Sequence, residues 1–255
     1  MIGEVGTVSV ASHLNLAAAL TAAGQRVDAL VTDCPYSART HTAYREQEDL
    51  RRHTIGYGAW SSDDVEAFVD AWVPLVTGWI VSITDHVLAP TWCAELEAAG
   101  LYTFSPIACV EPGRSARMSG DGPGQWSCWA VVARPRTAAA KAWGTLPGAY
   151  VVPLGYGRSK VSAPGVVGGK PIWLMRALVR DYSRPGDLVC DPCAGAGTTL
   201  VAAKMSGRRW IGGDCDAAHV EIARRRLEET VPCDARGTPI GGAKGKSEAF
   251  NWGDE

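Results

Sequence analysis

The stretch that most constrains the fold of this 255-residue chain runs from residue 187 to residue 216. An apolar segment, DLVCDP, reaches Asp191 and leads through Gly195 and Gly197 into the helix-like TTLVAAKMSG. A second apolar segment, RWIGGD, follows and ends in Asp214. A strand, a glycine turn, a helix and a second strand in this order are typical of a parallel α/β unit. The sequence therefore predicts an open α/β sheet with helices on both faces.

The acid that ends the second strand, Asp214, indicates an adenosine-containing ligand. A carboxylate at that place can accept hydrogen bonds from both hydroxyls of a ribose. Leu200 stands where a dinucleotide fingerprint needs its third glycine, which disfavours NAD. The segment GAKGKS is not a phosphate-binding loop either, because Ile240 replaces the first glycine. A cofactor without phosphate fits better, and Asp191 would face the ammonium group of S-adenosylmethionine.

Further strands and helices alternate around this unit. Apolar segments predict strands at residues 27–33, 78–85, 102–109, 126–134, 187–192 and 209–214. Helical patterns occupy residues 13–23, 62–76, 91–99, 171–183, 198–207 and 216–229. Polar, Gly-rich or Pro-rich stretches predict loops at residues 37–60, 111–125 and 144–169. We expect residues 1–229 to form one domain, followed by a polar tail at 230–255.

Composition narrows the class of protein. The net charge is −2, so a polyanion site must come from local clusters of Arg and Lys. No apolar run approaches the roughly 20 residues that span a bilayer. Eight cysteines without a secretory pattern predict free thiols in a reducing cytoplasm. The one C-x-x-C pair, Cys190 with Cys193, lacks the second pair of a structural zinc site, so we expect no metal.

Three motifs together resemble the amino-directed DNA methyltransferases, which methylate adenine N6 or cytosine N4. TDCPYS is similar to that family's Asp-Pro-Pro-Tyr motif, GGKPIWLMRALV to its Lys-Pro helix, and DPCAGAGTTL to its glycine loop. The order looks like the subgroup whose catalytic motif precedes the cofactor motif. The resemblance implies a Rossmann-like fold with a doubly wound, mixed seven-stranded sheet. It also implies S-adenosylmethionine as methyl donor, a restriction-modification context, and double-stranded DNA whose target base is flipped out.

The resemblance also assigns residues to the cofactor. They are Asp33, Lys170, Asp191, Cys193, Gly195, Gly197, Thr198, Thr199, Asp214 and Cys215. An aromatic residue is usual in the glycine loop, and its replacement by Cys193 leaves less aromatic surface beside the cofactor. Lys170 could instead be a surface lysine at a helix start, where the helix dipole disfavours it slightly.

The tetrad Asp33-Cys34-Pro35-Tyr36 is the candidate catalytic motif. An exocyclic amino group is a poor nucleophile, because its lone pair is delocalised into the ring of the base. Asp33 can accept one amino hydrogen, and the backbone carbonyl of residue 34 can accept the other. Pro35 stiffens the turn, and Tyr36 can stack on the flipped base. These assignments need no particular side chain at position 34.

Cys34 stands where the family has proline, and a thiol there raises a second hypothesis. A thiolate could attack a cytosine ring, as in carbon-directed methylation. The neighbouring carboxylate of Asp33 disfavours a thiolate, and the carbon-directed enzymes place Cys after Pro rather than before it. A packing role for Cys34 is therefore the favoured interpretation.

Ser37 and a set of basic residues outside the tetrad are candidates for DNA contacts. They are Ser37, Arg39, His41, Arg45, Arg51 and Arg52 after the tetrad, and Arg114, Arg117, Arg158 and Lys160 further along. The first group could also be a solvated surface helix, because acidic residues interleave with the arginines. A short target-recognition region, at about residues 111–169, predicts a short or degenerate target site.

Several other functions are compatible with these motifs. The acid-x-Pro-aromatic tetrad also occurs in enzymes that methylate RNA or protein glutamine, and a small-molecule substrate is a further alternative. The chain could also bind DNA without turnover because of Cys34, or transfer a larger group from a modified S-adenosylmethionine. The leading Asp33 favours adenine over cytosine. The oligomeric state, including a homodimer, is left open.

Overall fold

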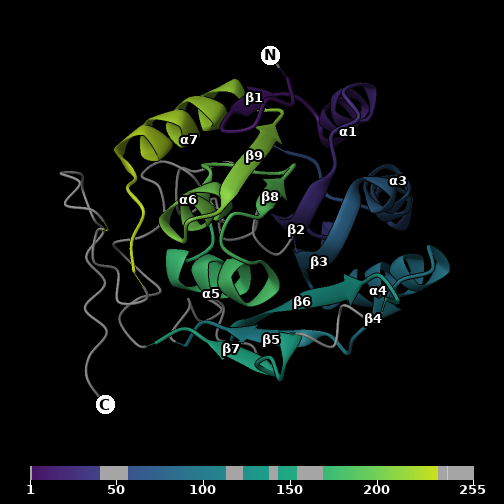
Figure 1. Ribbon diagram of the computed structural model, residues 1–255. Helices are drawn as coiled ribbons and strands as arrows, with labels where there is room; N and C mark the ends of the chain where they lie inside the picture. The colour runs from purple at the N-terminus through teal and green to yellow at the C-terminus, as the bar shows by residue number, and fades with distance from the viewer. Residues whose placement is uncertain are drawn as a thin grey trace.

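A computed structural model describes residues 2–40, 57–112, 123–137, 143–153, 169–234 and 240. Among these residues, nine strands form one mixed sheet with helices on both faces (Figure 1). The strands are β1 (Val8–Val10), β2 (Val27–Asp33), β3 (Val76–Thr84), β4 (Tyr102–Thr103), β5 (Ile107–Val110), β6 (Ser127–Arg134), β7 (Ala149–Val151), β8 (Leu188–Asp191) and β9 (Arg209–Asp214). The helices are α1 (His13–Ala22), α3 (Ser62–Trp72), the 3₁₀ turn η1 (Val73–Leu75), α4 (Ala89–Ala98), α5 (Ile172–Tyr182), α6 (Thr198–Met205) and α7 (Ala217–Glu229).

The strand order is β1-β9-β8-β2-β3-β6-β5-β7, and β4 pairs with β6. The strands from β1 to β3 in this order are all parallel, whereas β6 is antiparallel to β3, β4 and β5. The carboxyl ends of five neighbouring strands therefore meet at one edge of the sheet. Asp33, Asp191 and Asp214 end three of these strands, which brings the predicted catalytic and cofactor motifs together.

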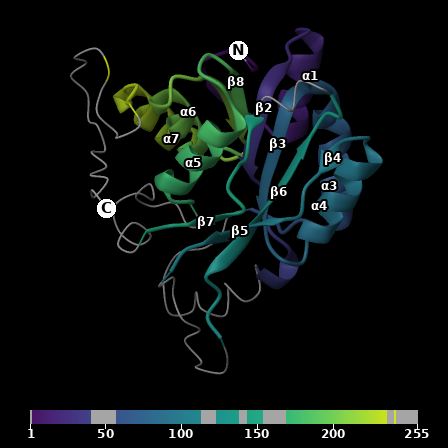
Figure 2. The same ribbon diagram turned by 60° about the horizontal axis from the view of Figure 1, so that its bottom comes forward.

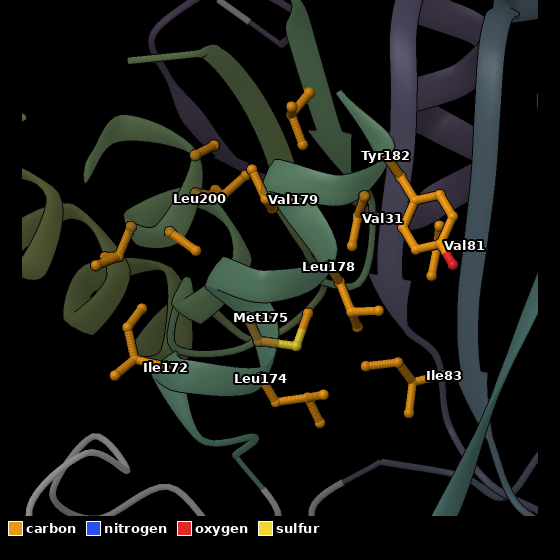
Figure 3. Packing of buried hydrophobic residues seen from close by; sticks show 14 of the residues in the cluster. Val31, Val81, Ile83, Ile172, Leu174, Met175, Leu178, Val179, Tyr182 and Leu200 are labelled. Carbon is orange, nitrogen blue, oxygen red and sulfur yellow. The ribbon is translucent and has the colours of Figure 1, made fainter. Parts of the chain in front are cut away.

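Two hydrophobic cores lie on opposite faces of the sheet, with α5, α6 and α7 on one side and α1, α3 and α4 on the other (Figure 2). Strand β2 is apolar because it contributes to both: Val31 packs under α5, and Leu30 packs toward α1 and α3. Figure 3 shows Leu178 and Met175 of α5 near Val31 and Ile83 of the sheet. This packing fixes the start of α5 beside the carboxyl end of β2.

The predicted mixed α/β sheet is confirmed, but the expected number of seven strands is wrong for the described residues. Strand β1 adds to the free edge of β9, and β7 forms within the stretch 144–169 that we predicted to be irregular. The strand predicted at 102–109 is divided into β4 and β5. Pro106 lies between them and has no backbone N–H to donate to a ladder.

No described helix is long and apolar enough to cross a membrane. Helix α7 ends at Glu229, where the predicted polar tail begins. Most of that tail, and most of the predicted loops 37–60, 111–125 and 144–169, lie outside the described residues.

Candidate active site

A pocket opens at the carboxyl edge of the parallel strands. Its wall is built from the tetrad after β2, the segment before α5, the turn after β8 and the end of β9. Many of the predicted site residues line it: Asp33, Pro35, Lys170, Asp191, Cys193, Gly195, Thr198, Thr199, Asp214 and Cys215. The pocket therefore joins the two motifs that are far apart in the sequence.

The glycine turn between β8 and α6 needs both of its glycines. Gly195 and Gly197 have φ angles of 49° and 77°, in the left-handed region that side chains disfavour. A Cβ on Gly197 would also lie only 2.8 Å from the Cβ of Ala223 in α7. Gly195 donates its backbone N–H to Asp214 Oδ2 at 2.8 Å, which ties the turn to the neighbouring strand.

Asp214 presents a carboxylate on the far side of this turn. Its Oδ1 accepts a hydrogen bond from the backbone N–H of Asp216 at 2.9 Å, and the Nδ1 of His219 lies 3.6 Å away. Only 13% of its side chain is exposed. These contacts fix the direction of the carboxylate, as a group that holds two ribose hydroxyls requires.

Asp191 lies between the turn and the tetrad, and 1% of it is exposed. Burial raises the pKa of its carboxyl to about 7, and the charge of Asp33 adds to the rise. Hydrogen bonds from Thr199, from Thr32 and from the backbone of Cys193 oppose this rise in pKa but do not cancel it. A cationic partner would stabilise the ionised form of this carboxyl and so lower its pKa again.

Asp33 and Lys170 form a partly buried ion pair. The Nζ of Lys170 donates to Asp33 Oδ2 at 2.7 Å, and the two side chains are 5% and 22% exposed. The other carboxylate oxygen, Asp33 Oδ1, is buried and has no hydrogen-bond partner among the described residues. The same ammonium lies 4.8 Å from the ring centroid of Tyr36. The alternative that Lys170 is a surface lysine is therefore wrong.

Cys34 and Cys193, the two positions that depart from the family pattern, contact each other. The thiols share a hydrogen bond that, together with burial, raises the pKa of Cys193 well above its ordinary value. Cys34 is 2% exposed, and its Sγ lies 3.7 Å from Thr32 Oγ1. These contacts fit the packing role that we favoured for Cys34.

The segment after the tetrad is clamped by Asp85 at the end of β3. Asp85 Oδ2 accepts hydrogen bonds from the backbone of Ser37 at 3.0 Å, from its hydroxyl at 2.6 Å, and from Thr40 Oγ1 at 2.5 Å. Trp60 N donates to Tyr36 O at 3.0 Å, which holds the two ends of the stretch 37–60 together. The predicted DNA contact by Ser37 is not supported, because its buried hydroxyl is used inside the protein.

Among the other predicted DNA contacts, the structure describes only Arg39, which is exposed. The others lie outside the described residues; they are His41, Arg45, Arg51, Arg52, Arg114, Arg117, Arg158 and Lys160. In the described part of the chain, no group of three His, Cys, Asp or Glu residues could hold a metal ion.

Some functional residues were not identified from the sequence. Thr32 had no signal, because it is one polar residue within an apolar strand. Asp85 ended a predicted strand but had no assigned role. His13, which also had no assigned role, lines the pocket, and its ring centroid lies 5.3 Å from that of Trp60.

Comparison with known proteins supports the sequence motifs. Residues 163–225 match the family described as DNA methylase. The chain is 44% identical over 59 residues to the Type II methyltransferase M2.DpnII of Streptococcus pneumoniae, which covers 23% of this chain and 22% of that protein. It is 39% identical over 59 residues to the DNA adenine methyltransferase YhdJ of Escherichia coli, and this match covers 23% of this chain and 20% of that protein. The resemblance to amino-directed DNA methyltransferases is confirmed.

The matched segments span about a fifth of the length of these curated relatives. Solved structures match over much more of the chain. The M1.HpyAVI-SAM complex aligns with a TM-score of 0.64 at 20% identity, over 87% of this chain and 98% of that one. TTHA0409 of Thermus thermophilus aligns with a TM-score of 0.59 at 20% identity, over 89% and 96%. These likenesses confirm the Rossmann-like fold, and the order of motifs that defines the subgroup stays a prediction.

Proposed function

We propose that this chain is a DNA amino-methyltransferase that uses S-adenosylmethionine and methylates a flipped base, adenine N6 in preference to cytosine N4. The observation that carries the proposal is Asp33, which lines a pocket that also contains Asp191 and Asp214 and whose buried Oδ1 has no hydrogen-bond partner among the described residues. A buried carboxylate oxygen without a partner is costly, and an amino hydrogen of the target base would satisfy it.

The residues of the pocket fit S-adenosylmethionine. Asp214 would hold the ribose hydroxyls, and Asp191 would hold the ammonium of the amino-acid end. The tight turn at Gly195 and Gly197 lets the backbone approach a ligand closely. Thr198 and Thr199 line the same wall. When bound, the cofactor supplies an electrophilic methyl group on a sulfonium.

The tetrad would prepare the amino group for that methyl. Asp33 Oδ1 accepts one amino hydrogen, and the carbonyl of Cys34 accepts the other, which localises the lone pair on nitrogen. Asp33 is then placed to take the proton that the nitrogen loses. Tyr36 holds the ring of the base by stacking. Removing a general base of this kind typically lowers a rate by about 10²–10⁴-fold.

The test compares Asp33→Ala with Asp28→Asn, a control at the opposite end of the same strand. Tritiated methyl transfer to DNA should fall by at least about 100-fold in Asp33→Ala and stay near wild type in the control. Calorimetry should show that S-adenosylmethionine still binds Asp33→Ala. Undiminished transfer in that variant would remove Asp33 from the mechanism.

Mass spectrometry of nucleosides from treated DNA identifies the product. We expect N6-methyladenine. N4-methylcytosine would correct the preference for adenine, and a larger adduct would indicate a modified donor. If the enzyme methylates RNA or protein but not DNA, that molecule would replace DNA as the proposed substrate. Binding of DNA and cofactor without any product would favour a protein that has lost turnover.

We further propose that the Arg-rich stretch 37–60 and the region 111–169 contact DNA within a single catalytic domain, residues 1–229. The exposed Arg39 supports this, because it lies three residues after Tyr36 of the tetrad. In gel-shift salt titrations, Arg39→Gln should reduce the slope of log affinity against log salt by about 1. Arg26→Gln, exposed at the opposite end of β2, is the matched control. Equal slopes in wild type and Arg39→Gln would contradict a phosphate contact there.

A further inference from the structure

Lys170 touches both side chains to which the proposed function assigns the target base. Its Nζ donates to Asp33 Oδ2 at 2.7 Å and lies 4.8 Å from the ring centroid of Tyr36. Lys170 immediately precedes Pro171, the N-cap of α5, and is itself 5% exposed. A lysine is rarely buried to this extent unless it is paired, so its position calls for a role.

The ion pair fixes the direction of the whole carboxylate. A carboxylate is planar, so when Oδ2 is fixed by the ammonium and the backbone holds Cβ, the direction of Oδ1 is set as well. Oδ1 then stays as the acceptor that no described group of the protein uses. If the ammonium were absent, the carboxylate could rotate about its Cβ–Cγ bond, and this torsion is broad in the absence of a partner.

The surroundings hold the ammonium in place. Pro171 restricts the backbone φ angle at the start of α5, and its carbonyl accepts a hydrogen bond from Met175 N at 3.2 Å. Met175, Leu174 and Leu178 are buried against the sheet (Figure 3), which anchors the start of α5 directly after Lys170 and Pro171.

Two roles can be distinguished for a lysine in this position. It could occupy the base site of the free enzyme and withdraw when the base enters, in which case its removal would accelerate the reaction. Alternatively, it could align Asp33 for the base, in which case its removal would slow the reaction. The anchored start of α5 and the unused Oδ1 favour alignment, because Oδ1 keeps its capacity to accept a hydrogen bond while Oδ2 stays in the ion pair.

We propose that Lys170 is a positioning residue that acts through Asp33: its ammonium fixes Oδ2, which aims Oδ1 at the amino group of the flipped base. This inference rests on the proposed function. It assigns to Lys170 a role in the transfer step, in addition to the border of the cofactor site that its sequence motif predicts.

The experiment compares Lys170→Met, Lys170→Gln and Lys170→Arg with wild type, and uses Lys204→Met as a control. Lys204 donates to Leu227 O at 2.8 Å, so its loss also removes a partly buried lysine hydrogen bond, but in the contact between α6 and α7. Single-turnover methylation gives the rate of transfer. Calorimetry gives the affinity for S-adenosylmethionine, and 2-aminopurine fluorescence at the target position reports base flipping.

Lys170→Met should lower the single-turnover rate by about 100-fold, the scale of a misplaced reactive group, while cofactor affinity and flipping change little. Lys170→Gln keeps a donor for Oδ2 without the charge and should recover part of the rate. Lys170→Arg keeps donor and charge in a different geometry and should also recover part of it. Lys204→Met should keep the wild-type rate.

A rate in Lys170→Met equal to or above that of wild type would overturn the inference and favour the occluding role. Equal losses in the Met, Gln and Arg variants, accompanied by lost cofactor affinity, would indicate a merely structural or cofactor role and would also overturn it. If Lys170→Met does not fold, the Lys170→Gln and Lys170→Arg variants still test the inference. It requires both variants to transfer methyl groups at part of the wild-type rate while base flipping stays intact. An inert wild-type enzyme would instead contradict the proposed function itself.

Discussion

The pKa of Asp191 predicts that cofactor binding weakens in mild acid. The pKa of this buried carboxyl is about 7, and binding of an ammonium group requires its ionised form. The apparent dissociation constant then rises by the factor 1 + 10^(pKa − pH). That factor is about 1.3 at pH 7.5 and about 33 at pH 5.5, so affinity should fall about 25-fold, or about 2 kcal/mol. A carboxyl with an ordinary pKa near 3.9 would give almost no change over this range.

The assay is calorimetric titration with S-adenosylmethionine from pH 5.5 to pH 7.5. The upper limit keeps the ligand's own amino group largely protonated, since such groups lose their proton near pH 8. Repeating the titration in buffers of different ionisation enthalpy should show that binding releases about half a proton at pH 7, because half of Asp191 is protonated there.

Two controls isolate Asp191 from other groups that face the ligand. The ligand 5′-methylthioadenosine keeps the adenosine but lacks the ammonium, so it reports any effect of the imidazoles of His13 and His219, which line the pocket. Its affinity should vary much less with pH. The variant Asp191→Asn should bind S-adenosylmethionine weakly and with a nearly flat profile. A flat wild-type profile without proton release would refute the reasoning.

Three further predictions concern the frame of the site. Asp85→Asn should lower the free energy of unfolding by about 1.5–3 kcal/mol, because charge-assisted hydrogen bonds to a buried carboxylate are lost. Burial alone would raise the pKa of Asp85, but its hydrogen bonds together lower it. The stabilisation that Asp85 gives the folded protein is therefore present above about pH 4 and lost in stronger acid. Urea titrations in which Asp85→Asn and wild type lose stability in parallel as pH falls would contradict this. Gly197→Ala should lower the free energy of unfolding by about 1–2 kcal/mol because of the left-handed φ angle alone. The new Cβ would also lie 2.8 Å from the Cβ of Ala223, which adds to the loss. An unchanged Tm would contradict the described conformation of the turn. Cys34→Pro should keep methyl transfer within about 10-fold of wild type, since only the thiol contacts with Cys193 and Thr32 are lost; an inactive proline variant beside an active Cys34→Ser would argue for a direct role of the side chain.

Local patterns predicted the parts of the fold that depend on local chemistry. The strand, glycine turn and helix around Gly195 are dictated by backbone angles and by apolar periodicity, which a sequence displays directly. Strand β7 was not predicted, because three residues within a Gly- and Pro-rich stretch give no usable periodicity. Its pairing with β5 supplies the backbone hydrogen bonds that make it a strand.

The pairings inside the site depend on which strands become neighbours. Strands β2 and β8 lie side by side in the sheet, although 154 residues lie between Asp33 and Leu188 in the sequence. That adjacency brings Cys34 to Cys193, so two departures that look independent in the sequence become one contact. The pairing of Lys170 with Asp33 has the same origin, since the two residues are 137 positions apart. No local pattern contains this information.

In the proposed function, the three acids at the carboxyl edge of the sheet have different tasks, and their surroundings in the structure differ accordingly. Asp33 is paired with an ammonium and keeps one oxygen available, which suits a group that must accept a hydrogen from the base. Asp191 is buried and has a raised pKa, so it can sense a cationic ligand. Asp214 is held by two backbone N–H groups, which suits a fixed acceptor for hydroxyls.

The partners of these acids also indicate where a ligand must bring positive charge. The ammonium of Lys170 pairs with Asp33, whereas Asp191 accepts hydrogen bonds from hydroxyl groups and from the backbone N–H of Cys193. The pocket therefore favours a ligand that carries a cation to Asp191, because such a ligand stabilises the ionised carboxyl. S-adenosylmethionine carries positive charge at both its ammonium and its sulfonium. Loss of the sulfonium charge on transfer would weaken the attraction between the ligand and these acids and would favour release of the product.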